Sequence, residues 1–502
     1  MSTITKILAS EVAEQIHNGS VIAFSGFTAN GTAKAVAREL SQRALKLHEK
    51  GIPFSVGIIS GANSGQSVEG DLARANALKF RAPFSTNRDF RNHTNFGQID
   101  FEDTHVGHMA ERLRRGYYGK IDWAFIEVSS VEIVGDKYRA TLTSAVGCAP
   151  TVIRLAEKVV LELNSFHSPN SGLLHDIYEC KEWPDREPIP LRHINDRIGT
   201  QYIEIDASKV IGVVESYIEE ESSDFGAVND FTRAIGQNVV DFLLNEQKLG
   251  RIPREFFPIQ SGVGKTGNSV MAAIAECSGF PVMNVYSEVA QDAVVEMIEK
   301  GRIDQVSCTS LSVTNECLKH VYGDIGFFSK HIVLRPSELS NSPELIRRFG
   351  VIAMNTAIEC DIYGDINSSH ICGSNLMNGI GGSADYARNG SITVFYTPSI
   401  AKGGKISAIV PFCSHIDSSE HDVDVIITER GIADLRGKGP LKRAKEIIEN
   451  CAHPDYKSLL RDYLKIAEQG HEPQSMRAAF AFHDTYMRKG SMRLTEFDRY
   501  LK

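Results

Sequence analysis

Residues 21–40 read VIAFSGFTANGTAKAVAREL, and this stretch sets the expected architecture. A short apolar run from Val21 to Phe24 ends in a Ser-Gly pair, and Gly31 precedes the helical pattern AKAVAREL. An apolar strand that leads through a glycine turn into a helix is the building unit of α/β proteins, whose parallel strands are covered by helices. The stretch therefore predicts a buried strand, a tight turn and a helix packed on a sheet.

The same alternation continues along the chain. Runs rich in Val and Ile are separated by helical patterns such as residues 268–276. The clearest further runs cover residues 158–163, 210–214, 331–334 and 423–428. Near-continuous apolar runs indicate strands that are buried on both faces. We therefore predict an α/β fold made of two related open domains with mainly parallel sheets.

A weak internal repeat supports two related halves. Ser261-Gly262-Val263 is followed by Gly267 and the helical pattern SVMAAIAE, in the order already seen at residues 25–40. A second pair of segments, DWAFIE at 122–127 and DVIITE at 424–429, ends each apolar run with an acid. Because both pairs occur in the same order, they favour a duplicated architecture.

The stretch EEESSDFGAVND at residues 219–230 is acidic and polar, which makes it the best candidate for the boundary between the halves. The predicted domains are therefore residues 1–222 and residues 223–502.

Composition excludes several classes of protein. The 502 residues include 54 Lys+Arg and 63 Asp+Glu, a net charge of −9, with 42% hydrophobic and 23% charged residues. These values are ordinary for a globular chain, and the acidic excess disfavours a general nucleic-acid binder. The N-terminal residues MSTITKILAS resemble neither a signal nor a transit peptide, and no apolar run reaches the roughly 20 residues of a membrane span. We expect a cytoplasmic protein that binds neither membranes nor nucleic acid.

The nine cysteines are scattered, and no CxxC pair is present. A compact zinc site or a thioredoxin-like motif therefore has no support. In a cytoplasmic chain this pattern predicts reduced, mostly buried thiols and no metal site.

Two glycine-rich segments resemble nucleotide-binding motifs without satisfying them. The segment SGVGKT at 261–266 lacks the first P-loop glycine, because that position is Ile259. The segment GIGGSA at 379–384 fits GxGxxA, but residues 374–378 before it do not form a convincing buried strand. Clustered glycines can bring backbone N–H groups close to a ligand, or can form a plain tight turn.

The segment YSEVAQD at 286–292 resembles the nucleophile segment of the acetyl-CoA hydrolase/transferase family. Further family motifs occur in the correct order over essentially the whole chain: SGFT at 25–28, QSGVG at 260–264, LRPSELSN at 334–341, MNGIGGS at 377–383, SIAKGGKIS at 399–407 and TERGIADLRG at 428–437. The resemblance implies two α/β domains of related topology with the active site in a cleft between them.

The resemblance also implies an activity, the transfer of CoA between short-chain acids such as acetate and succinate, propionate or butyrate. Glu288 would be the nucleophile of a ping-pong cycle through an acyl-glutamyl anhydride and a glutamyl-CoA thioester. A carboxylate suits this role because each intermediate remains a reactive acyl species. An acyl-CoA hydrolase on the same scaffold is the alternative, and a nucleotide-dependent acid–CoA ligase is a remote one because Ile259 breaks its motif.

Roles for other residues follow from the same resemblance. The backbone N–H groups of Val263 and Gly382 would form oxyanion holes. The first half would supply the acyl pocket, with substrate contacts at Gly26 and Phe27. Coenzyme A, an acyl-CoA co-substrate, would contact residues of the second half: Gly262, Gly264, Asn341, Gly381, Lys402 and Glu429. The family further implies a homodimer.

Each of these assignments has a plainer alternative. Asn341 is a natural helix cap, Lys402 could be a solvated surface lysine, and Glu429 could pair with Arg430 or Arg436. Many family members carry an arginine after the half-chain boundary that can meet CoA phosphate, whereas here the first arginine of that region is Arg233.

In the first half, Arg81 and Arg88 could meet a second substrate carboxylate, although surface ion pairs are the favoured interpretation.

Overall fold

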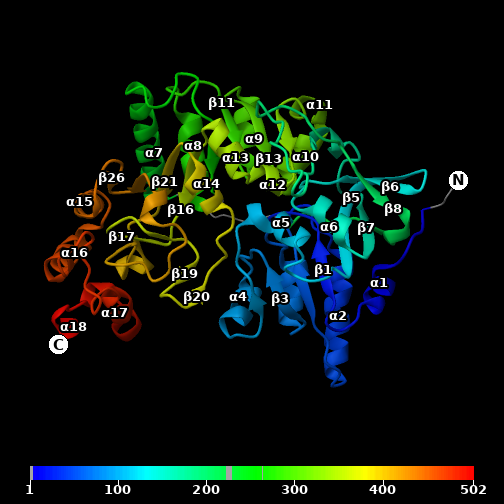
Figure 1. The fold of residues 1–502 in the computed structure, drawn as a ribbon, viewed down its shortest axis with the longest axis horizontal. Helices are drawn as coiled ribbons and strands as arrows, with labels where there is room; N and C mark the ends of the chain where they lie inside the picture. The colour runs from blue at the N-terminus through cyan, green and yellow to red at the C-terminus, as the bar shows by residue number, and fades with distance from the viewer. Residues whose placement is uncertain (1–3, 222–228, 263, 502) are drawn as a thin grey trace. The chain divides into compact units, whose positions relative to one another are not determined.

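The computed structural model describes residues 4–221, 229–262 and 264–501 (Figure 1). Its contacts divide it into two compact units, each drawn from several parts of the chain. The first unit takes Met1–Asp224, Asn284–Phe349 and Asn378–Gly382, and the second takes Phe225–Met283, Gly350–Met377 and Ser383–Lys502. The predicted boundary between residues 222 and 223 lies outside the described residues and stays a prediction.

The first unit is built on a nine-stranded sheet with the path β4-β3-β2-β1-β5-β6-β8, to which β7 and β9 add beside β5. Strand β1 pairs in parallel with both β2 and β5, while β6 is antiparallel to β5. The strands are β1 (Val21–Phe24), β2 (Val56–Ile59), β3 (Leu78–Ala82), β4 (Asp100–Phe101), β5 (Trp123–Val134), β6 (Lys137–Leu142), β7 (Lys158–Asn164), β8 (Ile203–Asp206) and β9 (Val210–Ser216). Helix α6 (Ala149–Leu155) packs against β1 and β5.

The first unit also contains a later group of strands. Strand β13 (Ile303–Cys308) lies between β11 (Met283–Tyr286) and β15 (Ile332–Leu334), and the short strands β12 (Val289–Ala290) and β14 (Ser310–Leu311) pair in parallel. This group carries the predicted nucleophile segment at its strand ends.

The second unit contains the strands β10 (Ile259–Ser261), β16 (Ile352–Thr356), β21 (Ile392–Tyr396) and β25 (Val425–Thr428) side by side and parallel, with β26 (Gly431–Asp434) antiparallel at the edge. Helices α7 (Asp230–Lys248) and α8 (Lys265–Glu276) pack on each other. The helices that follow β26, from orange to red in Figure 1, bury Tyr456, Leu460 and Phe482 in the core of this unit.

The predicted α/β class with mainly parallel sheets is confirmed. The run at 21–24 is β1, and the run at 158–163 is β7 with one residue added. The run at 423–428 begins its strand later, at Val425. The residue before it, Asp424, uses its side chain instead: Oδ2 accepts a hydrogen bond from the Thr393 backbone N–H at 2.9 Å.

The repeated aspartates have the same role in both halves. Asp122 Oδ2 accepts a hydrogen bond from the Val21 N–H at 2.9 Å, just as Asp424 does from Thr393. In each case the side chain accepts a backbone hydrogen bond from the first or second residue of a neighbouring parallel strand. The repeated aspartate therefore reflects one local interaction, in which an acidic side chain satisfies a backbone donor near the start of a strand.

The glycine that recurs after each Ser-Gly turn is required by packing. A Cβ at Gly267, within α8, would overlap the carbonyl oxygen of Gly262. At Gly31, which has φ +66°, a Cβ would lie 3.1 Å from the Ala145 nitrogen. At Gly267 the helix packs directly on the turn, whereas at Gly31 the chain packs on the segment around Ala145, and both close approaches favour glycine.

Within the described residues, which include all nine cysteines, no disulfide forms, and six of the thiols are buried. Burial raises the pKa of Cys148 and of Cys308 to about 12. In the same part of the chain, no helix combines the length and the apolar character that a bilayer crossing requires.

Candidate active site

Glu288 lies in the short link between β11 and β12 in the first unit. Its backbone is fixed against the end of β13: the Ser287 N–H donates to the Ser307 carbonyl at 3.0 Å, and the Thr309 N–H donates to the Glu288 carbonyl at 2.8 Å. The side chain is half-buried. The buried parallel strands thus place a carboxylate at their carboxyl ends, where α/β proteins commonly bind ligands.

Asn341 binds this carboxylate directly. Its Nδ2 donates a hydrogen bond to Glu288 Oε1 at 2.7 Å, and the Asn341 side chain is fully buried. Asn341 also follows the last residue of helix α12 (Ser337–Ser340), where its N–H donates to the Ser337 carbonyl at 2.9 Å. The helix-end role and a place in the site therefore hold together.

Gly382 touches the same carboxylate. A Cβ at this position would overlap both Glu288 Oε1 and Asn341 Nδ2, so that no other residue fits without displacing them. The preceding Gly381 has φ +62°, and a Cβ there would lie 3.3 Å from the Phe84 ring. The structure thus brings Glu288, Asn341 and Gly382 together, although they are far apart in the sequence.

The environment of Glu288 disfavours its charge. Burial raises the pKa of Glu288 to about 7, against the opposing effect of the Asn341 hydrogen bond. A carboxyl group near its pKa at neutral pH is the state expected for a side chain that must ionise in order to react. The geometry and the electrostatics at Glu288 both fit a nucleophile.

An apolar cluster lies beside Glu288 in the chain and in space. Its buried members are Phe27, Ala62, Val106, Ala145 and Val289, with Phe84 packed against them. The predicted substrate residue Phe27 is therefore brought next to Val289, the neighbour of Glu288. Small apolar side chains around an aromatic ring provide a surface for a short acyl chain.

The loop that carries Phe27 is strained. Gly26 has φ +97°, and its carbonyl lies so close to Gly61 and Gly147 that a Cβ on either would be 2.7 or 2.6 Å away. Thr28 and Ala29 both adopt positive φ, 56° and 68°. Such a conformation is rare for a β-branched residue, and it persists where the surroundings fix it, which is common at binding sites.

The chain matches two family domains. The acetyl-CoA hydrolase/transferase N-terminal domain matches residues 4–215, and the acetyl-CoA hydrolase/transferase C-terminal domain matches residues 319–464. The chain belongs to the acetyl-CoA hydrolase/transferase family. The family prediction, and with it the prediction of an enzyme, is confirmed.

Curated relatives of this acetyl-CoA hydrolase/transferase family member cover nearly its whole length. It is 44% identical to the propanoyl-CoA:succinate CoA transferase of Escherichia coli, over 97% of this chain and 99% of that one. It is 41% identical to the succinyl-CoA:acetate CoA-transferase of Clostridium kluyveri, over 97% and 90%. An acetyl-CoA hydrolase of Schizosaccharomyces pombe is 36% identical, over 95% and 94%.

Solved structures share the fold of this family member. RipA from Yersinia pestis superposes with a TM-score of 0.70 at 20% identity, over 92% of this chain and 97% of that one. A 4-hydroxybutyrate CoA-transferase from Porphyromonas gingivalis gives a TM-score of 0.61 at 20% identity, with the same coverage.

The other described residues that the family motifs predict lie in the second unit. The Gly262 N–H donates to the Met354 carbonyl at 2.8 Å, and Gly264 has φ +128° at the start of α8. Val263, the other predicted oxyanion donor, lies outside the described residues. Lys402 is exposed and has φ +50°, followed by two glycines that also have positive φ.

Glu429 follows β25 and binds a neighbouring loop of the second unit. It accepts hydrogen bonds from the Ser399 N–H, at 2.8 Å, and from the Ser399 hydroxyl. It also pairs with Arg430 at 3.0 Å, whereas Arg436 pairs with Glu246 and Asp434. The ion pair with Arg430 is thus realised, and Glu429 supports the start of the segment that carries Lys402.

Arg81 is not the surface residue that the sequence favoured. Its side chain is fully buried, pairs with Glu69 at 2.8 Å and donates to the Phe84 carbonyl at 3.1 Å. Sequence reasoning missed this because the acid that pairs with Arg81 comes from a different element. Arg88, at the start of helix α4 (Arg88–Asn95), is exposed.

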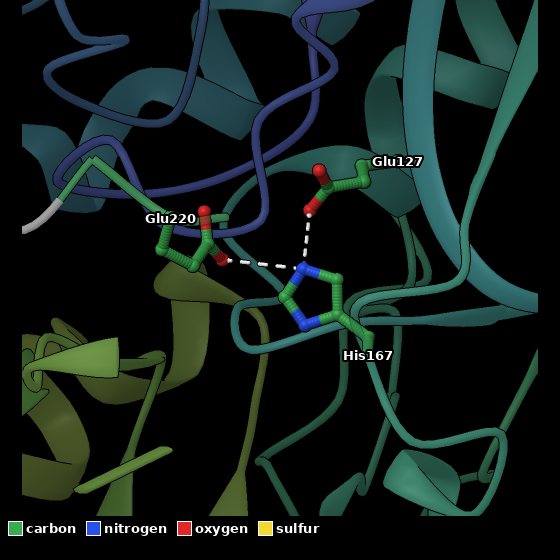
Figure 2. Close-up of side chains that lie close together, drawn as sticks. All are labelled: Glu127, His167 and Glu220. Atoms are coloured by element: carbon green, nitrogen blue, oxygen red, sulfur yellow. Dashed lines mark ion pairs between the residues drawn. The ribbon is translucent and has the colours of Figure 1, made fainter. Parts of the chain in front are cut away.

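A second group of ionisable side chains is buried in the first unit (Figure 2). His167 Nε2 lies 3.2 Å from Glu127 Oε2 and 3.6 Å from Glu220 Oε1, and the ligand atoms of the three residues lie within 4.8 Å of one another. Tyr322 approaches the other ring nitrogen of His167 at 2.9 Å. Such a triad has the donor types of a metal site.

The ammonium group of Lys34 already pairs with both glutamates of this triad. Lys34 Nζ lies 3.1 Å from Glu127 Oε1 and 2.9 Å from Glu220 Oε2. Burial alone would raise the pKa of Glu127, but Lys34 and His167 outweigh it and place that pKa far below its usual range. Glu220 Oε1 also accepts the Gly31 N–H at 2.7 Å, so that we assign the group a structural role beneath the strained loop.

Proposed function

We propose that this chain is a CoA-transferase that moves CoA between short-chain carboxylic acids, with Glu288 as the nucleophile. The single observation that carries the proposal is the arrangement around Glu288, whose carboxylate is bound by Asn341 at 2.7 Å and touches Gly382. The names of the bacterial relatives supply the reaction class and suggest acetate, propionate and succinate as the acids.

Burial favours the proposed covalent steps. It raises the pKa of Glu288 to about 7, which means that the charged carboxylate is the disfavoured state of this side chain. Conversion of the carboxylate to an anhydride or a thioester removes the charge and therefore relieves the desolvation cost. An environment that disfavours the free carboxylate relative to the glutamyl intermediates accelerates their formation.

The reaction would proceed as follows. A Glu288 oxygen attacks the thioester carbonyl of the donor acyl-CoA, which forms an acyl-glutamyl anhydride and expels the CoA thiolate. The thiolate then attacks the glutamyl carbonyl, expels the donor acid and leaves a glutamyl-CoA thioester. The acceptor carboxylate reverses both steps and leaves as its CoA thioester. The asparagine amide at Glu288 Oε1 would orient the other oxygen for attack.

Each addition creates an oxyanion, for which we propose backbone donors at Gly382 and Val263. One such donor is worth about 3 kcal/mol. In the same proposal Phe27 and its apolar neighbours receive the acyl chain, while Lys402 and the glycine turn at 262–264 contact CoA. The family resemblance leads us to propose in addition a cytoplasmic location and a homodimer. Light scattering of the purified protein tests the oligomeric state.

The hydrolase alternative uses the same nucleophile. In that case water replaces the acceptor carboxylate in the attack on the glutamyl-CoA thioester. The Schizosaccharomyces pombe relative, which is named acetyl-CoA hydrolase, supports this alternative. The two activities differ in whether CoA thiol appears without an acceptor acid.

The decisive experiment is intact-mass measurement after the protein is mixed with acetyl-CoA. We expect a CoA adduct that maps to Glu288 and that disappears when acetate or succinate is added. The adduct should be absent in Glu288→Ala. Glu296→Gln is the matched control, because Glu296 is an exposed glutamate in the next helix and pairs with the exposed Lys300.

Two results would contradict the proposal. An adduct on a cysteine would remove Glu288 from the mechanism. Release of CoA thiol at the full rate without any added acid would instead assign the chain to the hydrolases.

A further inference from the structure

The loop Gly379–Gly382 has few side chains with which to fix its own position. Three of its four residues are glycines, and glycine loses more conformational freedom on folding than any other residue. Yet Gly382 must stay in contact with the Glu288 carboxylate, where a Cβ would already overlap. Contacts from outside the loop must therefore define where it lies.

Asp103 provides the strongest of these contacts. The Ile380 N–H donates to both carboxylate oxygens of Asp103, at 2.8 and 3.0 Å. A Cβ on Gly379 would lie 2.5 Å from Asp103 Oδ1, so that the carboxylate and the loop backbone are in close contact. Three residues further on, the Val106 N–H donates to the Gly381 carbonyl at 3.3 Å. Hydrogen bonds to a charged acceptor are stronger than neutral ones.

The segment that carries Asp103 is itself attached to the core. Glu102 N–H donates to the Arg81 carbonyl at 3.0 Å, and Thr104 N–H donates to the Pro83 carbonyl at 3.4 Å. The buried Arg81 guanidinium in turn binds Glu69 and the Phe84 carbonyl. The carboxylate of Asp103 is thus presented to the loop from a segment whose backbone is bonded on both sides.

We propose that Asp103 is a positioning residue of the reaction: by binding Ile380 it sets the distance between the Gly382 backbone and Glu288. This inference rests on the proposed function, in which Glu288 is the nucleophile and Gly382 stabilises an oxyanion. Asp103 does not touch the reacting atoms, and it acts through the loop. A shift of about 1 Å in such a group can cost roughly a hundredfold in rate.

The test compares Asp103→Ala, Asp103→Asn and Asp100→Ala. Asparagine retains a carbonyl oxygen that can accept the Ile380 N–H, whereas alanine retains none. We expect Asp103→Ala to lower kcat about ten- to a hundredfold while KM for acetyl-CoA changes less than about threefold, with Asp103→Asn in between. Asp100, an exposed aspartate on β4, is the matched control and should leave kcat unchanged.

Two further measurements separate positioning from folding and from the proposed function. Thermal unfolding of the three variants should be alike, and the rate of CoA adduct formation on Glu288 should fall with kcat. If Asp103→Ala forms the adduct as fast as the wild type, or if its loss of kcat follows a loss of stability that asparagine does not restore, the role of Asp103 is overturned. If the wild type itself forms no adduct on Glu288, the proposed function is wrong, and the positioning role of Asp103, which rests on it, is wrong as well.

Discussion

At the scale of single residues, the site is a compromise between charge and reactivity at Glu288. The surroundings that make this carboxylate costly to ionise are the same ones that would favour its acylated forms. A raised pKa of an acid means that the folded chain binds the proton more tightly than the unfolded chain does. Folding stability that involves Glu288 therefore rises as the pH falls from about 7 towards the ordinary value of 4.5.

This gives a prediction for activity and for stability. Because the carboxylate form attacks, kcat/KM should fall tenfold for each pH unit below about 7, where burial places the pKa of Glu288. Glu288→Gln should lose turnover and gain on the order of 2 kcal/mol of unfolding free energy at pH 8, with no gain at pH 4. Rate profiles and urea unfolding at both pH values measure this. A flat profile between pH 5 and pH 8 would contradict it.

At the scale of elements, the architecture depends on closely packed junctions, where a glycine turn meets the helix that follows it. The sequence repeat predicted these junctions because Ser-Gly turns and later glycines are local signals. The contacts that complete the site were not predictable in this way. Asp103 and Ile380 are far apart in sequence, and although Ile380 lies in the MNGIGGS motif, Asp103 belongs to none of the motifs, so that their hydrogen bond has no local signature. The burial of Arg81 and Glu220 was missed for the same reason, since each is paired by other elements.

The junction in the second unit can be tested with two helical glycines. Gly267→Ala places a methyl group onto the Gly262 carbonyl and should destabilise the protein by about 1–3 kcal/mol. Gly323, the last residue of helix α10 (Asn315–Gly323), has open space around it, so that Gly323→Ala should be neutral or slightly stabilising. Urea unfolding distinguishes them. Equal stability of the two variants would show that the close approach at Gly267 is not needed.

At the scale of the whole molecule, the proposed reaction requires a chain of net charge −9 to bind an anionic co-substrate beside a carboxylate. The fold class and the family could be predicted from the sequence, because the strand patterns and the family motifs are continuous in it. The role of Glu288 as the nucleophile stays a prediction. The charge balance at the proposed CoA site could not be predicted, since it depends on which lysines and arginines are already paired. Lys402 is exposed in a turn with positive φ, where a single cation can act on an anion.

The dependence of KM on ionic strength therefore tests whether Lys402 attracts the anionic co-substrate against the repulsion of the net negative chain. Lys402→Ala should raise KM for acetyl-CoA about tenfold at low salt with kcat unchanged, because it removes binding that substrate and transition state share. The ratio of the two KM values should shrink as salt shortens the Debye length to about 8 Å. Lys405→Ala, three residues further along the same exposed loop, is the control. A ratio that does not change with salt would rule out a charge contact.

The burial of six of the nine thiols makes the native enzyme well suited to a colorimetric assay. Disulfide reagents that report released CoA react with thiolates, and a buried cysteine whose pKa lies near 12 is almost entirely protonated at pH 8. The protein should therefore contribute little background, and the half-buried Cys277 is the first position to replace with serine if any remains. Turnover with and without acceptor acid could then be followed continuously in one cuvette, without separating the protein from its product.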